Sequence, residues 1–429
     1  MRLTNVYATD WTWGGQGSGE PVERSLRLGR LTQFYEAAFA QMPAVLAREK
    51  MAGERVRGAR VPIDGTVSGA TVWLFLLPSG QVVAAITIDV RAGLDDTIDL
   101  LEDGYYATLT VDGQPLAAFL LGLGAVQVDS GRSEGFLSER HQIAFASLSD
   151  GETVPDDHVV QQVIYRSRLP YRREFSSIKY PAELNRRPTT LGAVGPYVSV
   201  MAGHQDYLEN AVFLSAVQTV AAAAKLHEIR DQAYLAVRSF RQRQDWTVTT
   251  EDRRRRLGQL AESLGDLELE LSFSVEAVSD FGLLVPSLRA ESYHDTLYDC
   301  MSLGDGAETV ARMLERLERS IAAEATSVES LERRADEQRR ARWTVAVGFL
   351  TTTAAPLGLL FAFFGINALE VDATASMVAA RYLWVYLSLL ALVLTGVALF
   401  VALLVRERRE RRLEATNGDR GGRASRVLL

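Results

Sequence analysis

Short runs of β-branched and aromatic residues, bounded by Gly, Pro or Asp, recur through the first half of the chain. Such runs are typical of strands. The predicted strands cover residues 71–77, 81–90, 105–111, 158–166 and 195–203. Helical patterns, such as the one over residues 30–49, separate some of them. Residues 1–203 are therefore predicted to form an α/β domain.

The pattern changes to almost pure helix over residues 204–342. Apolar residues recur at spacings of three and four across residues 205–240 and again across 249–281, which predicts two helices. A third helix carries an apolar seam with alternating spacings of four and three, as in a coiled coil. The seam positions are Val310, Leu314, Leu317, Ile321, Glu324, Val328, Leu331, Ala335, Gln338 and Arg342.

This seam requires a partner helix, and symmetry-related copies of the same helix would provide one. The pattern continues without a break from about Asp305 to Gly365, a helix on the order of 90 Å long at 1.5 Å per residue. Two seam positions, Glu324 and Gln338, are polar. They are expected either to face a solvated axis of the stalk or to pair with a neighbouring helix.

Two charge-free segments follow. Residues 343–369 and 382–405 contain no Asp, Glu, Lys or Arg, and each exceeds the roughly 20 residues needed to cross a bilayer. They predict two C-terminal transmembrane helices, placed at 343–367 and 382–405, with an external loop at 368–381 and a basic tail at 406–429.

Arginines flank these segments on the sides away from the loop. The positive-inside rule then predicts an integral membrane protein with both termini in the cytoplasm and residues 1–203 as a cytosolic domain. The opening residues lack the apolar core of a secretory signal. The single cysteine, Cys300, suits a reducing compartment.

Composition narrows the function. A net charge of −8 makes nucleic acid an improbable partner. The chain has no phosphate loop, nucleophile elbow or HExxH helix, so we expect no enzyme and no resident cofactor. None of the five histidines is spaced as a ligand pair, and each is expected to be a surface or core residue. Those histidines are His141, His158, His204, His227 and His294.

Small and hydroxyl residues line one face of the first charge-free segment. Those residues are Thr344, Gly348, Thr351, Ala355, Gly358 and Ala362. Two interpretations stay open, because close helix packing and the lining of a narrow aqueous pore both require such a stripe. Pro356 would add a kink.

The stripe ends at the tripeptide Gly365-Ile366-Asn367, and Pro356 stands nine residues before the glycine. This segment, together with an α/β domain, a stalk helix and two final spans, resembles the CorA superfamily of divalent-cation channels and transporters. The resemblance implies a funnel-shaped homopentamer in which five first spans line the pore. It also implies that Gly365 and Asn367 hold a hydrated cation at the mouth, so that Asn367 contacts the metal through water.

The resemblance has two departures. Ile366 stands where the magnesium-transporting branch has methionine, and the family's common Met-Pro-Glu-Leu segment is absent. Glu370 and Asp372 can still form an acidic ring that attracts cations. Because only oxygen groups line the expected path, magnesium is favoured over zinc, cobalt or nickel. A ZntB-like zinc transporter and a non-transporting membrane scaffold or sensor with the same fold are the alternatives.

A basic collar flanks the predicted spans. Its arginines are Arg339, Arg340, Arg342, Arg406, Arg408 and Arg409. Such a collar is expected to set topology and to attract anionic headgroups of the lipid bilayer. Leu359, Val347 and the collar itself are alternative gates.

Overall fold

The computed structural model describes most of the chain. The described residues are 1–14, 42–60, 66–91, 94–129, 131–148, 153–169, 171–172, 174, 176–203, 206–242, 250–365 and isolated positions between 380 and 402. By its contacts the chain divides into two units, Met1–Ala323 and Glu324–Leu429. The sheet and most helices belong to the first unit.

A seven-stranded sheet organises the first unit, with the strand order β11-β12-β10-β1-β6-β5-β3. Neighbouring strands pair antiparallel except β10 and β12, which are parallel. The strands are β1 (Arg2–Ala8), β3 (Ala44–Ala52), β5 (Val67–Leu76), β6 (Val82–Val90), β10 (Arg140–Ser147), β11 (Leu191–Val194) and β12 (Val198–Gly203). Two small sheets join β2 (Thr12–Trp13) to β9 (Val126–Gln127), and β4 (Val56–Arg57) to β7 (Thr110–Val111) and β8 (Gln114–Pro115).

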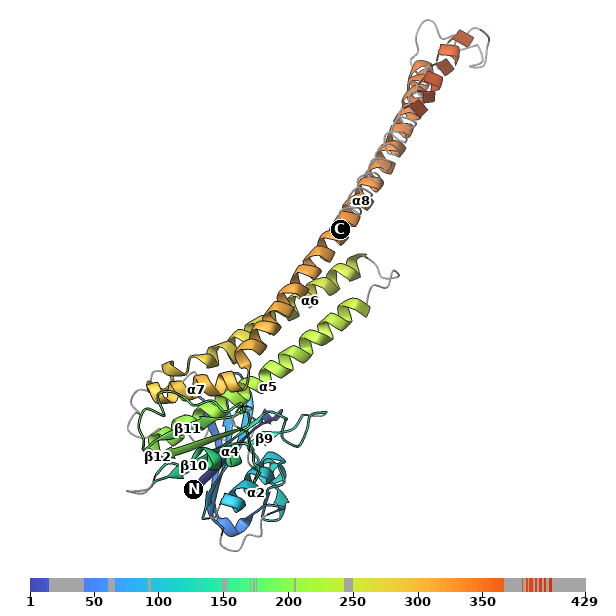
Figure 1. Cartoon of the computed structure of the whole chain (residues 1–429). Helices are drawn as coiled ribbons and strands as arrows, with labels where there is room; N and C mark the ends of the chain where they lie inside the picture. The colour runs from blue at the N-terminus through green and yellow to red at the C-terminus, as the bar shows by residue number, and fades with distance from the viewer. Residues whose placement is uncertain are drawn as a thin grey trace. The chain divides into compact units, whose positions relative to one another are not determined.

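Helices cover both faces of the large sheet. Helices α5 and α7 contact one face, and α2 and α4 contact the other (Figure 1). The helices are α2 (Leu94–Tyr105), α3 (Leu116–Gly122), α4 (Asp157–Ile164), α5 (Asp206–Gln242), α6 (Thr250–Leu271), α7 (Leu288–Cys300) and α8 (Leu303–Gly365). An α/β fold is therefore present in the N-terminal part, as predicted, but the layer formed by α5 and α7 lies beyond the predicted limit at residue 203.

Alternation along the strands produces two separate cores. In β6, Val83 and Ala85 pack with α5 and α7, whereas Ala84 and Ile86 face the core that includes α2 and α4. Successive side chains of a strand point to opposite faces, so a strand buried on both sides is a continuous apolar run. This explains why residues 81–90 were recognisable as a strand.

The predicted strands at 71–77, 81–90 and 195–203 are confirmed as parts of β5, β6 and β12. The predicted strand at 158–166 is wrong, because these residues form α4, whose first turn is capped by the Asp156 side chain accepting from the Val159 N–H. The prediction at 105–111 is mostly wrong, since α2 ends at Tyr105 and only Thr110–Val111 is a strand. The helical pattern at 30–49 also fails where β3 begins at Ala44; residues 30–41 lie outside the described part.

The helical half is largely as predicted. Residues 205–240 fall almost entirely in α5, and the helix expected from Asp305 to Gly365 is α8. The predicted helix at 249–281 changes after Leu271 into a π-helical turn at Ser272–Glu276, followed by two 3₁₀ turns. Helix α7 was missed.

The membrane prediction needs correction. Within the described ranges, none of the helices has the length and apolar character that a bilayer crossing demands. Residues 343–365 are the end of α8, which begins in a segment rich in Arg and Glu, and only isolated positions of 382–405 are described. The predictions of transmembrane helices at 343–367 and 382–405, of a membrane channel, and of an integral membrane protein with cytoplasmic termini are therefore wrong.

Candidate functional site

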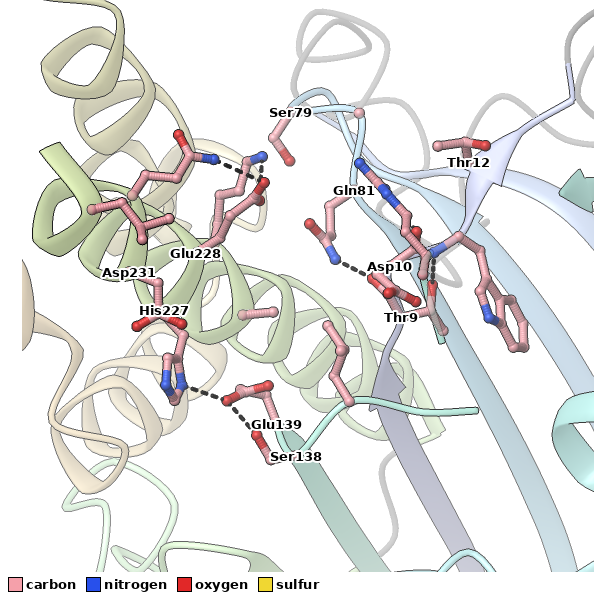
Figure 2. Close-up of a pocket in the computed structure, with 18 residues that line it drawn as sticks. Thr9, Asp10, Thr12, Ser79, Gln81, Ser138, Glu139, His227, Glu228 and Asp231 are labelled. Carbon is pink, nitrogen blue, oxygen red and sulfur yellow. Dashed lines mark hydrogen bonds and ion pairs between the residues drawn. The ribbon is translucent and has the colours of Figure 1, made fainter. Parts of the chain in front are cut away.

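A cavity of about 570 Å³ lies between α5 and the loops at one end of the large sheet. Its lining comes from the segment after β1, the turn between β5 and β6, the residues before β10 and one face of α5 (Figure 2). All of these elements belong to the first unit. The volume is in the range of small-molecule sites in proteins.

The sheet side of the cavity is fixed by a compact hydrogen-bond network. The Gln81 side-chain amide donates to the Thr9 carbonyl, and Thr9 Oγ1 donates to the Val82 carbonyl at 2.8 Å. Asp10 Oδ2 accepts from the Ser133 N–H at 2.9 Å. The other carboxylate oxygen of Asp10 is buried and has no hydrogen-bond partner among the described residues. Asp10 therefore has spare acceptor capacity beside the cavity.

The helix side carries three charged residues, Lys225, Glu228 and Asp231. Lys225 Nζ forms ion pairs with Glu228 at 2.7 Å and with Glu270 at 2.6 Å. Burial opposes the charge on Lys225, but these two carboxylates outweigh it and raise the pKa of Lys225. Asp231 lies one helical turn from His227 on the same helix (Figure 2).

A histidine and a carboxylate link the two sides. Figure 2 shows Glu139, which precedes β10, pointing toward His227 of α5. The distance from His227 Nδ1 to Glu139 Oε1 is 2.9 Å, and Ser138 Oγ donates to the same carboxylate at 2.7 Å. This contact fixes the loop before β10 against the helix.

The electrostatics of the cavity favour a positively charged or hydroxyl-bearing ligand. Four carboxylates line it, those of Asp10, Glu139, Glu228 and Asp231. Two cations also line it. Lys225 is paired with Glu228 and Glu270, and Arg132 lies 3.8 Å from Asp129 and donates to the Asp10 carbonyl. In the part of the chain that the structure describes, no three His, Cys, Asp or Glu side chains are grouped as a metal ion would require.

The predicted cation site falls largely outside the described residues. Gly365 is the last residue of α8, whereas Ile366, Asn367, Glu370 and Asp372 lie beyond it. The collar residues Arg406, Arg408 and Arg409 also lie outside the described part, whereas Arg339, Arg340 and Arg342 are exposed on α8. These assignments stay predictions.

The predicted stripe of small and hydroxyl residues does lie on one helix. All six residues belong to α8, and Thr344, Thr351, Gly358 and Ala362 are exposed. Thr344 Oγ1 donates to the Arg340 carbonyl at 2.9 Å, and Thr351 Oγ1 donates to the Val347 carbonyl at 2.8 Å. Both hydroxyl protons are thus used within the helix, which leaves their oxygens as acceptors.

The first residues of the α8 seam are buried by other parts of the same chain. Val310, Leu314, Leu317 and Ile321 are buried in the single chain, so symmetry-related copies are not needed to cover them. Farther along α8, Leu331 is 50% exposed. Of the polar seam positions, Glu324 is half-buried and Gln338 is exposed.

Two serine-histidine contacts resemble catalytic pairs but lie in the core. His141 Nε2 is 2.8 Å from Ser199 Oγ, and His294 Nδ1 is 2.9 Å from Ser215 Oγ. All four residues are completely buried. Because no substrate can reach them in this fold, we assign these pairs a structural role.

Sequence reasoning did not identify the residues of the cavity. Asp10, Glu139 and Glu228 are far apart along the chain and meet only through the sheet topology. The one local signal was the spacing of Lys225, Glu228 and Asp231, which places three charges at helical intervals on α5, directly after the charge-free residues 210–224.

Comparison of the chain with protein-family models, with curated proteins and with solved structures finds no match in any of the three.

Proposed function

We propose that this chain serves divalent-cation transport as an assembly of identical copies. The proposal rests on the resemblance of the segment around Gly365-Ile366-Asn367 to the CorA superfamily. It concerns the passage of cations and assigns no element of the chain to the bilayer, in keeping with the correction above.

One observation supports the proposal most directly. Helix α8 is continuous from Leu303 to Gly365, so an uninterrupted helix leads from the folded α/β unit to the tripeptide. The same helix carries the stripe of small and hydroxyl residues on one face. The resemblance implies five copies, and a ring of five such helices would bring the Asn367 amides of all copies together.

The proposed cation is magnesium ahead of zinc. Magnesium gives up its water reluctantly and is held well by oxygen acceptors that contact its hydration shell. Between residues 343 and 371 the chain has no histidine, cysteine or methionine, which are the ligands that would favour zinc. Selection by charge and hydrated size would let several divalent ions compete.

Cation uptake tests this proposal. The purified full chain is reconstituted with liposomes that contain a magnesium-sensitive dye, and external magnesium or zinc is added. We expect magnesium uptake that external zinc, cobalt or nickel reduces by competition. Zinc uptake without magnesium uptake or competition would contradict the metal assignment.

A complete lack of uptake for every ion would contradict transport itself. A protein-free liposome preparation measures the leak, and the mass of the reconstituted assembly checks that several copies are present. With assembly intact and flux absent, the non-transporting scaffold or sensor becomes the better description.

A further inference from the structure

A second surface of the α/β unit is built from arginine and tyrosine. It consists of Arg140 at the start of β10, Arg166 after α4, Tyr105 and Tyr106 at the end of α2, and Tyr197 between β11 and β12. The aromatic rings surround Tyr105, with centroid distances of 5.2 Å to Tyr106 and 5.5 Å to Tyr197. We call these five residues the Arg-Tyr surface.

Arg166 is the least satisfied cation of this surface. Its guanidinium carbon lies 3.9 Å from the centroid of the Tyr105 ring, and its hydrogen bond to Gln142 Oε1 is long, at 3.5 Å. A guanidinium has five N–H donors, and among the described residues the remaining donors of Arg166 have no acceptor. The side chain is half-buried, and none of its nitrogen atoms is among the fully buried atoms that lack a partner, so these donors are open to solvent and to a ligand.

The backbone holds Arg166 in an unfavourable conformation. Its φ is 48°, in the left-handed region that costs a non-glycine residue of order 1 kcal/mol or more. Burial lowers the pKa of Arg166, the neighbouring tyrosines Tyr105, Tyr106 and Tyr197 oppose this, and the positive charge of Arg140 adds a smaller lowering effect. The fold therefore keeps two guanidinium groups close together at a cost in free energy.

No carboxylate neutralises this pair among the described residues. Arg140 donates to the backbone carbonyls of Ser138 and Leu137, at 3.1 Å and 2.8 Å, and to that of Tyr105. The acids nearby are committed elsewhere. Asp99 pairs with Arg168 at 2.7 Å, Glu139 contacts His227, and Glu102 pairs with Arg60.

A second cavity adjoins the Arg-Tyr surface. It has a volume of about 600 Å³, and Arg140 and Tyr197 are among its lining residues. Arg230, Glu139 and Asp305 also line it. Glu139 Oε1 already contacts His227 and Ser138, whereas the Asp305 carboxylate can accept hydrogen bonds from hydroxyl groups. Tyr197 is 48% exposed, so its ring is accessible to a planar ligand.

We propose that the Arg-Tyr surface and the adjoining cavity bind a mononucleotide. The phosphate contacts Arg166, whose open N–H donors suit an oxyanion, and the charge of Arg140 strengthens the contact. The base stacks on Tyr197, and a sugar hydroxyl donates to the Asp305 carboxylate in the cavity. This inference does not depend on the proposed transport function.

Equilibrium binding of adenosine monophosphate to the purified full chain tests the proposal. We expect saturable binding that Arg166→Gln weakens at least tenfold and Tyr197→Ala weakens about fivefold. Arg168→Gln is the matched control, because Arg168 is a nearby arginine with a carboxylate partner, and it should change the affinity less than twofold. Unchanged thermal unfolding of each variant ensures that only folded protein is compared.

Three results would overturn the proposal. One is the lack of saturable binding to the wild-type chain at millimolar nucleotide. Another is an equal loss in Arg166→Gln and Arg168→Gln, which would show a nonspecific charge effect. The third is equal affinity for inorganic phosphate and adenosine monophosphate, because the proposed stacking on Tyr197 requires the base to contribute.

Discussion

At the scale of single residues, the clearest result concerns histidine. His141 and His294 are completely buried, and each bonds a serine hydroxyl in the core. The His294 ring also contacts the Val278 carbonyl at 2.8 Å, an arrangement that suits the neutral imidazole. Burial lowers the pKa of His141 to about 3 and that of His294 to about 4.

These pKa values predict a loss of stability in acid. Below about pH 6.5 these histidines become protonated in the unfolded chain but stay neutral in the folded protein. The free energy of unfolding therefore falls as the pH decreases toward 4. Each histidine contributes up to about 1.4 kcal/mol per pH unit in this window. Denaturant unfolding at several pH values measures the slope.

Substitution of a single histidine shows which residue causes the pH dependence of the free energy of unfolding. His294→Gln should give a shallower pH dependence, whereas His158→Gln, at an exposed position of α4, should leave it unchanged. An unchanged slope in His294→Gln would mean that this histidine titrates normally in the folded protein.

At the scale of elements, the sequence predicted correctly those strands and helices whose apolar pattern is clear over their own length. β6 was recognisable because both of its faces are buried, and α5 because its apolar spacing is long and unbroken. Helix α4 was missed because Val159, Val160 and Val163 favour a strand by propensity. The Asp156 cap and packing against the sheet override that preference.

Helix α6 offers a test of intrinsic helix propensity. Gly258 and Gly265 lie in its interior, and a Cβ added at either would meet no atom within 4 Å. Alanine at each should therefore stabilise the first unit by about 1 kcal/mol, measured by denaturant unfolding. Gly104→Ala is the opposing control, since its Cβ would lie 2.2 Å from Asn5 Oδ1, and this variant should be less stable. Destabilisation by the α6 substitutions would show that these glycines have a conformational role.

The seam of α8 provides a second test at this scale. Leu314 is fully buried in the single chain, so Leu314→Ala should destabilise the protein by about 2–5 kcal/mol. Leu331 lies on the same seam but is half exposed in the single chain. Leu331→Ala should therefore lower the free energy of unfolding of the single chain by less than about 1 kcal/mol. Denaturant unfolding at low protein concentration measures the free energy of unfolding of both variants. An equally large loss in Leu331→Ala would show that another copy covers this position.

At the scale of the whole molecule, sequence reasoning predicted the α/β unit and the long helix but not the cavities. The acidic cavity joins Asp10, Glu139 and Glu228, which are brought together by strand order and by α5 crossing the sheet. Strand order is a long-range property that no local spacing encodes. The membrane prediction was wrong for a different reason, because no helix in the described part of the chain combines the length and the apolar character that a bilayer crossing requires.

The two cavities give the first unit opposite chemical preferences. The cavity beside Asp10 and Glu228 is lined by four carboxylates and two cations, whereas the one beside Arg140 adjoins two guanidinium groups that have no ion pair among the described residues. Cations and phosphate-bearing ligands are thus expected to bind at different places on the same unit. Neither cavity includes the Gly365-Ile366-Asn367 tripeptide, on which the proposed transport function rests.

Magnesium uptake by an Asn367→Ala variant tests the central claim most directly. Uptake into liposomes is measured for the wild-type chain, for Asn367→Ala and for Asn417→Ala, which makes the same chemical change in the C-terminal tail. If a ring of Asn367 amides receives the hydrated ion, Asn367→Ala should lose at least about tenfold in rate while Asn417→Ala keeps the wild-type rate. Equal uptake by the wild-type chain and Asn367→Ala, at matched protein content, would contradict the account.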